Sequence, residues 1–151
     1  AELVNDETFR LFEDINIGLA VDTDHGLLVP TIYDTPSLSV RELSTEINDL
    51  ASRARDGDLS YDEMQNGTFT ISNAGSLGTY MNTPKIFPPQ TAILGLCAVF
   101  EELELIDGDV VPRKKVHLCL TYDHRVVEGA SAVGFVQSVG SLLENAEALL
   151  S

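Results

Sequence analysis

The sequence predicts an α/β (α+β) fold, and two changes of hydrophobic period carry that prediction. From Val116 to Asp123 apolar residues alternate with polar ones, which is the pattern of a strand with one buried face. After Gly129 they recur every three or four residues, as along one side of an amphipathic helix. The same succession occurs earlier, where strands predicted over 16–22 and 27–33 precede a helix predicted from residue 40. The chain of 151 residues is 44% hydrophobic, enough for the core of one domain.

Turn and cap residues set the limits of the early elements. The segment from Asp22 to Gly26 has the composition of a turn between the two strands. Pro30 indicates an edge or a bulge in the second strand, because proline has no N–H to donate to a neighbour. Cap residues are available from Thr35 to Ser39, and the helix should stop at Asp56-Gly57. We assign this helix a scaffolding role.

The middle of the chain is predicted to alternate short elements with irregular backbone. Ser60 and Glu63 have the spacing of a capping box, so a short helix up to Asn66-Gly67 should precede a strand over 68–72. Two glycines follow that strand, and they permit either a turn or the close approach of a ligand. A central strand is expected over 91–99, and Asp107-Gly108 has the composition of a two-residue hairpin turn.

A titratable cluster lies where the last predicted strand gives way to the last helix. Asp123, His124, Arg125 and Glu128 all fall in this connection, which a rigid element holds on each side. A histidine with an ordinary pKa of about 6.5 is largely neutral at pH 7 and can accept a proton from a thiol or a hydroxyl. His124 is therefore either a general base or a connector residue whose ring bonds to backbone carbonyls, and this segment alone leaves both open.

The charge balance excludes several classes of partner. Aspartates and glutamates number 24 against 9 lysines and arginines, which gives a net charge of -15. Such a surface repels phosphate groups, so we expect no nucleic-acid partner and no membrane partner. No apolar run approaches the roughly 20 residues of a membrane helix, and the acidic N-terminal segment is unlike a signal peptide, which predicts a cytoplasmic protein. The excess of acids fits both a protein adapted to high salt and an ordinary acidic protein.

The two cysteines show no spacing typical of a metal site. Cys97 and Cys119 lie in apolar segments, which predicts buried free thiols rather than a disulfide or a zinc site. We therefore expect no metal.

Two separated motifs resemble a known family. They are TFTISNAGSLG at 68–78, continued by TP and PPQTAILGL at 83–96, and YDHRVVEGASA at 122–132. These residues resemble the catalytic domain of the dihydrolipoamide acyltransferases, the core components of 2-oxo acid dehydrogenase complexes. The resemblance runs from about Asn16 to the C-terminus. It implies the coenzyme A-dependent acyltransferase fold related to chloramphenicol acetyltransferase, a mixed β-sheet packed with helices.

The resemblance also implies how the chain relates to a whole family member. Residues 1–151 would form an acyltransferase catalytic domain that lacks its N-terminal portion, either as a fragment or as a short relative. Neither a lipoyl domain nor a peripheral-subunit-binding domain is expected within these residues.

The motifs further imply the roles of individual residues. His124 matches the catalytic histidine, which would take the proton from coenzyme A or dihydrolipoamide so that the thiolate can attack a thioester. Ser72 matches the serine whose hydroxyl stabilises the oxyanion. Glu128 stands where the family usually has aspartate, which leaves open whether its carboxylate acts in catalysis or holds the loop. The substrate-binding positions implied by the motif are Asn73, Gly75, Gly78, Thr83 and Pro84.

The expected activity is the transfer of an acyl group between dihydrolipoamide and coenzyme A. The family implies a homotrimer, with histidine from one chain and serine from its neighbour, that assembles into a larger cubic or dodecahedral core. Coenzyme A would be a substrate, and another domain would supply the lipoyl group. Two alternatives stay open: a non-catalytic core or assembly fragment, and a small-molecule O-acetyltransferase of the chloramphenicol type.

Overall fold

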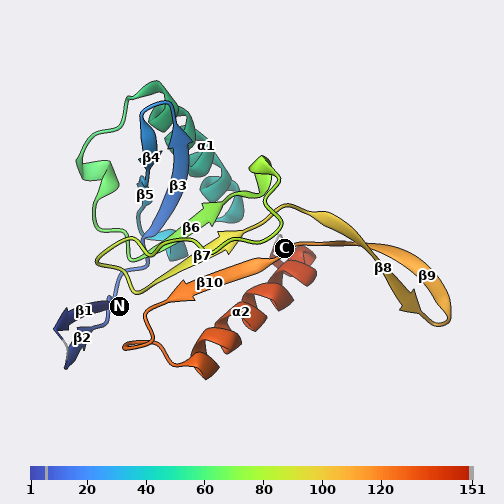
Figure 1. The fold of residues 1–151 in the computed structure, drawn as a ribbon. Helices are drawn as coiled ribbons and strands as arrows, with labels where there is room; N and C mark the ends of the chain where they lie inside the picture. The colour runs from blue at the N-terminus through green and yellow to red at the C-terminus, as the bar shows by residue number, and fades with distance from the viewer. Residues whose placement is uncertain (6, 150–151) are drawn as a thin grey trace.

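The main element of the fold is a six-stranded mixed sheet, seen in a computed structural model that describes residues 1–5 and 7–149. Its strand order is β10-β7-β6-β3-β4, and β5 also pairs with β3 (Figure 1). Strands β3, β6 and β7 run parallel, whereas β10 is antiparallel to β7, and β4 and β5 are antiparallel to β3. The strands are β3 (Ile17–Thr23), β4 (Gly26–Leu28), β5 (Thr31–Ile32), β6 (Phe69–Asn73), β7 (Ala92–Leu96) and β10 (Leu118–Tyr122).

Two hairpins lie outside the main sheet. Strands β8 (Phe100–Ile106) and β9 (Asp109–Lys115) form one that extends away from the rest of the chain (Figure 1). Its turn has Asp107 at φ 53° and Gly108 at φ 94°, the left-handed backbone that a two-residue hairpin turn requires, so this prediction is confirmed. Strands β1 (Glu2–Asn5) and β2 (Thr8–Arg10) form the other, which the sequence did not predict.

Helix α1 (Val40–Asp56) matches its predicted limits because both caps are present. The Ser39 hydroxyl accepts from the Glu42 N–H at 3.3 Å, and the Glu42 carboxylate accepts from the Ser39 N–H at 2.8 Å. At the other end Gly57 has φ 77° and closes the helix. The helix packs against β3 and β5 and buries Leu50.

Three predicted elements are shorter than expected. The strand predicted over 91–99 is β7, which ends at Leu96. The strand predicted over 27–33 is broken into β4 and β5 at Pro30, whose carbonyl still accepts from the Leu19 N–H at 2.8 Å. The helix predicted after Ser60 is only a 3-10 turn, η2 (Asp62–Met64). It stops there because the backbone of Gln65 is extended, at φ -107° and ψ 168°, and Asn66 has φ 56°. The Tyr33 hydroxyl donates to the Asp62 and Gln65 carbonyls at 2.7 and 3.1 Å. The other 3-10 turns are η1 (Thr35–Ser37), η3 (Gly75–Leu77) and η4 (Ala146–Leu149).

Helix α2 (Gly129–Glu144) packs against β10, as predicted, but little of its apolar side is covered. Of the expected stripe only Ala132 is buried, while Phe135, Leu142 and Leu143 are exposed. A single strand, β10, is the main contact of this helix, so one chain cannot bury the whole stripe. None of the helices in the described part of the chain combines the length and the apolar character needed to span a bilayer.

Candidate active site

The loop that carries His124 is fixed at both ends by backbone hydrogen bonds. Where β10 ends, the Asp123 N–H donates to the Thr91 carbonyl at 2.8 Å. The Asp123 carbonyl then accepts from the N–H groups of Val126 and Val127 at 3.0 and 2.9 Å, which forms a tight turn. His124 lies on the outside of this turn with an exposed side chain. The loop therefore presents the imidazole from a rigid support.

The residues on either side of the histidine, Asp123 and Arg125, form an ion pair that reinforces the turn. The Arg125 guanidinium donates to the Asp123 carboxylate through Nε at 3.0 Å and Nη2 at 2.6 Å, and the Arg125 N–H adds a third bond at 3.0 Å. These hydrogen bonds lower the pKa of Asp123 to about 2. Asp123 is therefore ionised at neutral pH and serves to hold the loop.

The His124 ring has few contacts of its own. It lies 5.4 Å from the Tyr122 ring, centroid to centroid, and its Nε2 faces the start of α2, 3.8 Å from where a Cβ would stand on Gly129. Within residues 1–5 and 7–149, no group hydrogen-bonds to the imidazole. The interpretation of His124 as a connector satisfied by backbone carbonyls therefore finds no support in the structure.

Glu128 takes the N-cap position of α2. Its backbone is extended, at φ -80° and ψ 148°, and its carbonyl accepts from the Ala132 N–H at 3.0 Å. The carboxylate is exposed, makes no capping hydrogen bond, and forms no ion pair with any residue in the described ranges. Within one chain, therefore, the Glu128 backbone caps α2, while its carboxylate makes no hydrogen bond or ion pair with the described residues.

Ser72 lies near the carboxyl-terminal end of β6, and its side chain is half-buried. The turn after it is closed by the Asn73 side chain, whose Oδ1 accepts from the Gly75 N–H at 2.9 Å. A Cβ on Gly75 would lie 2.5 Å from the Cys97 carbonyl oxygen, so this glycine allows two backbones to approach closely. At Gly78 the reason for glycine is different: its backbone has φ 77°, a left-handed conformation that other residues rarely adopt.

Thr83 and Pro84 lie further along the same connection. Asn82, the residue before them, was not predicted from the sequence to belong to the site. Thr83 is exposed and Pro84 half-buried. The Asn82 carboxamide oxygen fills the space that Gly95 leaves by lacking a side chain. Gly95 pairs in register with Ser72, and side chains paired in this way point to the same face, so Asn82 lies beside the Ser72 row. A glycine inside a predicted strand indicates such a close approach, and it could have identified this contact.

One chain does not bring Ser72 and His124 together. The strand register places Ser72 level with Gly95, and Gly95 level with Cys119. Strand β10 ends at Tyr122, three residues after Cys119 and, at about 3.3 Å per residue, roughly 10 Å further along the strand direction. His124 lies in the turn beyond that end. The two predicted catalytic residues therefore lie at opposite ends of the sheet.

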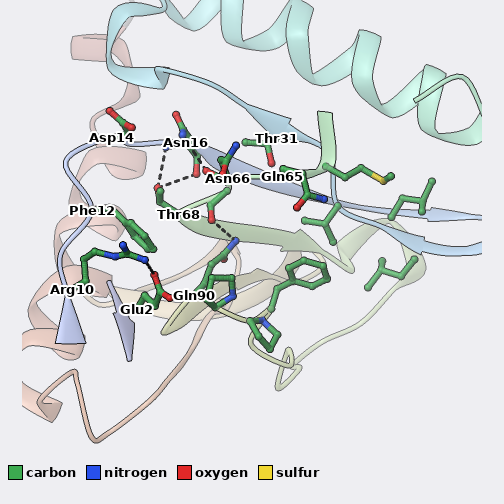
Figure 2. Close-up of a pocket in the computed structure, with 18 residues that line it drawn as sticks. Glu2, Arg10, Phe12, Asp14, Asn16, Thr31, Gln65, Asn66, Thr68 and Gln90 are labelled. Atoms are coloured by element: carbon green, nitrogen blue, oxygen red, sulfur yellow. Dashed lines mark hydrogen bonds and ion pairs between the residues drawn. The ribbon is translucent and has the colours of Figure 1, made fainter. Parts of the chain in front are cut away.

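A cavity of about 640 Å³ lies near the amino end of β6, between the β1–β2 hairpin and the segment before β7 (Figure 2). The buried amides in its wall are already paired: Gln90 accepts from the Thr70 hydroxyl at 2.7 Å, and Asn16 donates to the Asn66 carbonyl at 3.0 Å. None of the site residues predicted from the sequence lines this cavity. Across the residues that the structure describes, no group of three or more His, Cys, Asp or Glu side chains is placed to hold a metal ion.

Comparison with known proteins identifies the family. Residues 1–151 match the family described as 2-oxoacid dehydrogenases acyltransferase (catalytic domain). The chain belongs to this family. A curated relative, the dihydrolipoyllysine-residue succinyltransferase component of the 2-oxoglutarate dehydrogenase complex of Bartonella vinsonii subsp. berkhoffii, is 44% identical over 136 residues, covering 90% of this chain and 33% of the relative. The chain thus spans about a third of the length of that acyltransferase.

Solved structures of family members share the fold. Azotobacter vinelandii dihydrolipoamide acetyltransferase, studied for the catalytic roles of a serine, a histidine and an asparagine, superposes with a TM-score of 0.85 at 40% identity, covering 93% of this chain and 58% of that one. The cubic core of a pyruvate dehydrogenase multienzyme complex gives the same values: TM-score 0.85, 40% identity, and coverage of 93% and 58%. The predicted family and the acyltransferase fold are both confirmed.

Proposed function

We propose that this chain forms the acyl-transferring core of a 2-oxo acid dehydrogenase complex, and that two copies of the chain complete each active site. The reaction moves an acyl group between dihydrolipoamide and coenzyme A. The proposal rests on one observation. The family motifs assign catalytic roles to Ser72 and His124, yet these residues lie at opposite ends of one sheet. Residues that act on the same reacting carbonyl must lie within about 3 Å of the atoms they serve, so the two come from different copies.

The chemistry follows from the two side chains. A thiol with a pKa of about 8.5 is mostly protonated at pH 7, so the neutral His124 ring accepts its proton as the sulfur attacks the thioester carbonyl. The carbonyl oxygen becomes an oxyanion, to which the Ser72 hydroxyl donates a hydrogen bond. When the intermediate collapses, the second thiolate leaves and takes the proton back from His124. The acyl group thus passes from sulfur to sulfur without an acyl-enzyme.

The Azotobacter vinelandii protein supports the pairing of these residues. The serine and histidine in its catalytic mechanism are separated by the same number of positions as Ser72 and His124. Its asparagine follows the histidine at the distance at which Glu128 follows His124. An amide side chain cannot exchange a proton at neutral pH, so this position does not require a proton carrier. We therefore infer that Glu128 shapes the loop, and that His124 alone moves the proton.

A homotrimer accounts for the surfaces that one chain leaves uncovered. A ring in which each copy gives His124 to one neighbour and Ser72 to the other has a repeated head-to-tail interface. Such an interface would cover apolar side chains that are exposed here, among them Leu142 on α2 and Leu103 and Leu105 on the β8–β9 hairpin. The lipoyl group would come from another domain, and further copies would build the larger core.

Acyl transfer to dihydrolipoamide from acetyl-CoA and from succinyl-CoA tests the proposal. His124→Ala should lose about 10²- to 10⁴-fold in rate, the range for a general base. Ser72→Ala should lower kcat by about 10²- to 10³-fold with KM unchanged, because its hydrogen bond forms to a charge present only in the transition state. His25→Ala is the matched control, since His25 is exposed in the β3–β4 turn. Equal rates for His124→Ala and His25→Ala would rule out the proposed base, and a preference for a hydroxyl acceptor would favour an O-acetyltransferase.

A further inference from the structure

Two thiols face each other between β7 and β10, outside the chemistry assigned above. The Cys97 and Cys119 sulfurs are 3.7 Å apart. Cys97 directly follows β7, and its N–H donates to the His117 carbonyl at 3.2 Å, so the backbone ladder to the β10 segment continues at this point. The two cysteines are therefore diagonal neighbours on adjacent antiparallel strands.

The strand register explains why the sulfurs approach so closely. The residue directly opposite Cys119 is Gly95, which has no side chain to separate the thiols. The thiols also differ in environment, since Cys97 is 4% exposed and Cys119 is half-buried. Burial, and to a smaller extent the hydrogen bond with Cys119, raises the pKa of Cys97. Cys119 is thus the thiol that a solvent-borne reagent reaches first.

We propose that Cys97 and Cys119 form a reversible two-electron redox site that a peroxide converts to an intramolecular disulfide. The Cys119 thiolate attacks one oxygen of hydrogen peroxide, the O–O bond breaks, and sulfenic acid and hydroxide form; the hydroxide takes up the thiol proton to give water. The Cys97 thiol then attacks the sulfenic sulfur, which releases a second water and forms the S–S bond. Both cysteines are oxidised, and the peroxide is reduced.

Closing the disulfide requires movement of both thiols, of the Asn82 side chain and of the Cys97 backbone. A disulfide bond is about 2.05 Å long, so the sulfurs must approach by about 1.7 Å from their present separation of 3.7 Å. The group that occupies the neighbouring space is the Asn82 carboxamide, whose oxygen lies 3.7 Å from the Cys97 sulfur. This is the end of a side chain, which can turn aside. Diagonal neighbours stand about 7–8 Å apart, at or beyond the usual Cα separation of a disulfide, so the Cys97 backbone just after β7 must also move toward β10.

Oxidation should also affect the turn after Ser72, a consequence that rests on the proposed function. Leu96 and Ala98, on either side of Cys97, both bond to this turn: the Leu96 carbonyl accepts from the Ala74 N–H at 3.1 Å, and the Ala98 N–H donates to the Thr79 carbonyl at 2.8 Å. Movement of Cys97 toward β10 therefore shifts the turn that positions the Ser72 hydroxyl. We expect the oxidised form to transfer acyl groups several-fold more slowly, and a reductant to restore the rate.

The disulfide is tested by mass, without any measurement of activity. The protein is treated with hydrogen peroxide, denatured in an alkylating reagent, and examined by intact mass and peptide mapping. Wild type should lose two hydrogens and both alkylation sites, give a Cys97–Cys119 cross-linked peptide, and recover with dithiothreitol. Cys97→Ser removes the resolving thiol, so its Cys119 should accumulate sulfenic acid that dimedone traps, whereas wild type should not.

Three results of this experiment would overturn the proposal. They are two thiols that stay open to alkylation after peroxide treatment, disulfides only between chains, and equal dimedone labelling of wild type and Cys97→Ser. In the activity assay, Cys119→Ser should keep its rate after peroxide treatment while wild type slows. A disulfide proven by mass that leaves the wild-type rate unchanged would overturn the coupling to the Ser72 turn. Absence of transfer in the untreated protein would instead count against the proposed function.

Discussion

Replacing Gly75 by alanine tests how the turn after Ser72 is built. An added Cβ would lie 2.5 Å from the carbonyl oxygen of Cys97 and 2.8 Å from its carbonyl carbon. Both are backbone atoms, and hydrogen bonds from the Cys97 and Ala98 N–H groups fix them in place. The clash therefore cannot be relieved by a side-chain rotation. We expect Gly75→Ala to lower the free energy of unfolding by about 1–3 kcal/mol, the usual cost of overpacking.

Urea unfolding followed by far-UV circular dichroism, at one protein concentration, measures this change. Gly134→Ala is the matched control, because Gly134 lies in α2 with no atom within 4 Å of the added Cβ. Alanine is the better helix former, so the control should gain about 0.5–1 kcal/mol. Gly75→Ala should also lower kcat, since relief of the clash moves the Ser72 turn. An unfolding midpoint for Gly75→Ala equal to or above that of wild type would refute the close approach described here.

Three further predictions concern charge. The pKa of Asp123, lowered to about 2 by Arg125, means that this ion pair stabilises the fold above about pH 4 and loses its effect as the pH falls toward 2. Asp123→Asn should therefore be less stable than wild type by about 0.5–1 kcal/mol at pH 7, and urea midpoints that differ equally at pH 7 and pH 2 would contradict this sign. The net charge of -15 predicts a higher melting temperature in molar salt than in dilute buffer; an unchanged value would favour an ordinary acidic protein. Glu128→Asp should keep its transfer rate, because the N-cap role uses the backbone, and a complete loss of rate would assign a catalytic role to the carboxylate.

The elements with a regular period were predictable from the sequence, and so was the loop that they enclose. Strand β10 and helix α2 were both found where the alternation changed, which placed His124 between two rigid elements. The same reasoning failed for β1 and β2, whose residues show no clear period, and for the coverage of α2. A helical period identifies an apolar side, but it does not say what covers that side.

The relation between the two motifs could not be predicted from the residues alone. Ser72 lies near the end of β6 and His124 lies just after β10, so the distance between them depends on whether those strands run parallel. Because β10 is antiparallel to β7, the two residues fall at opposite ends of the sheet, as the family resemblance had implied by assigning them to different chains. Asn82 was missed because Gly95 indicates that something approaches β7 closely but does not say which distant side chain it is.

Mixing two inactive variants tests the shared site most directly. His124→Ala keeps an intact Ser72, and Ser72→Ala keeps an intact His124. If each site takes one residue from each of two neighbouring copies, random assembly of equal amounts leaves about one site in four with both residues intact. We predict that subunits co-expressed in equal amounts recover about a quarter of the wild-type transfer rate, far above either variant alone. A mixed assembly that stays at the rate of the separate variants would place both residues in one chain and contradict the shared site.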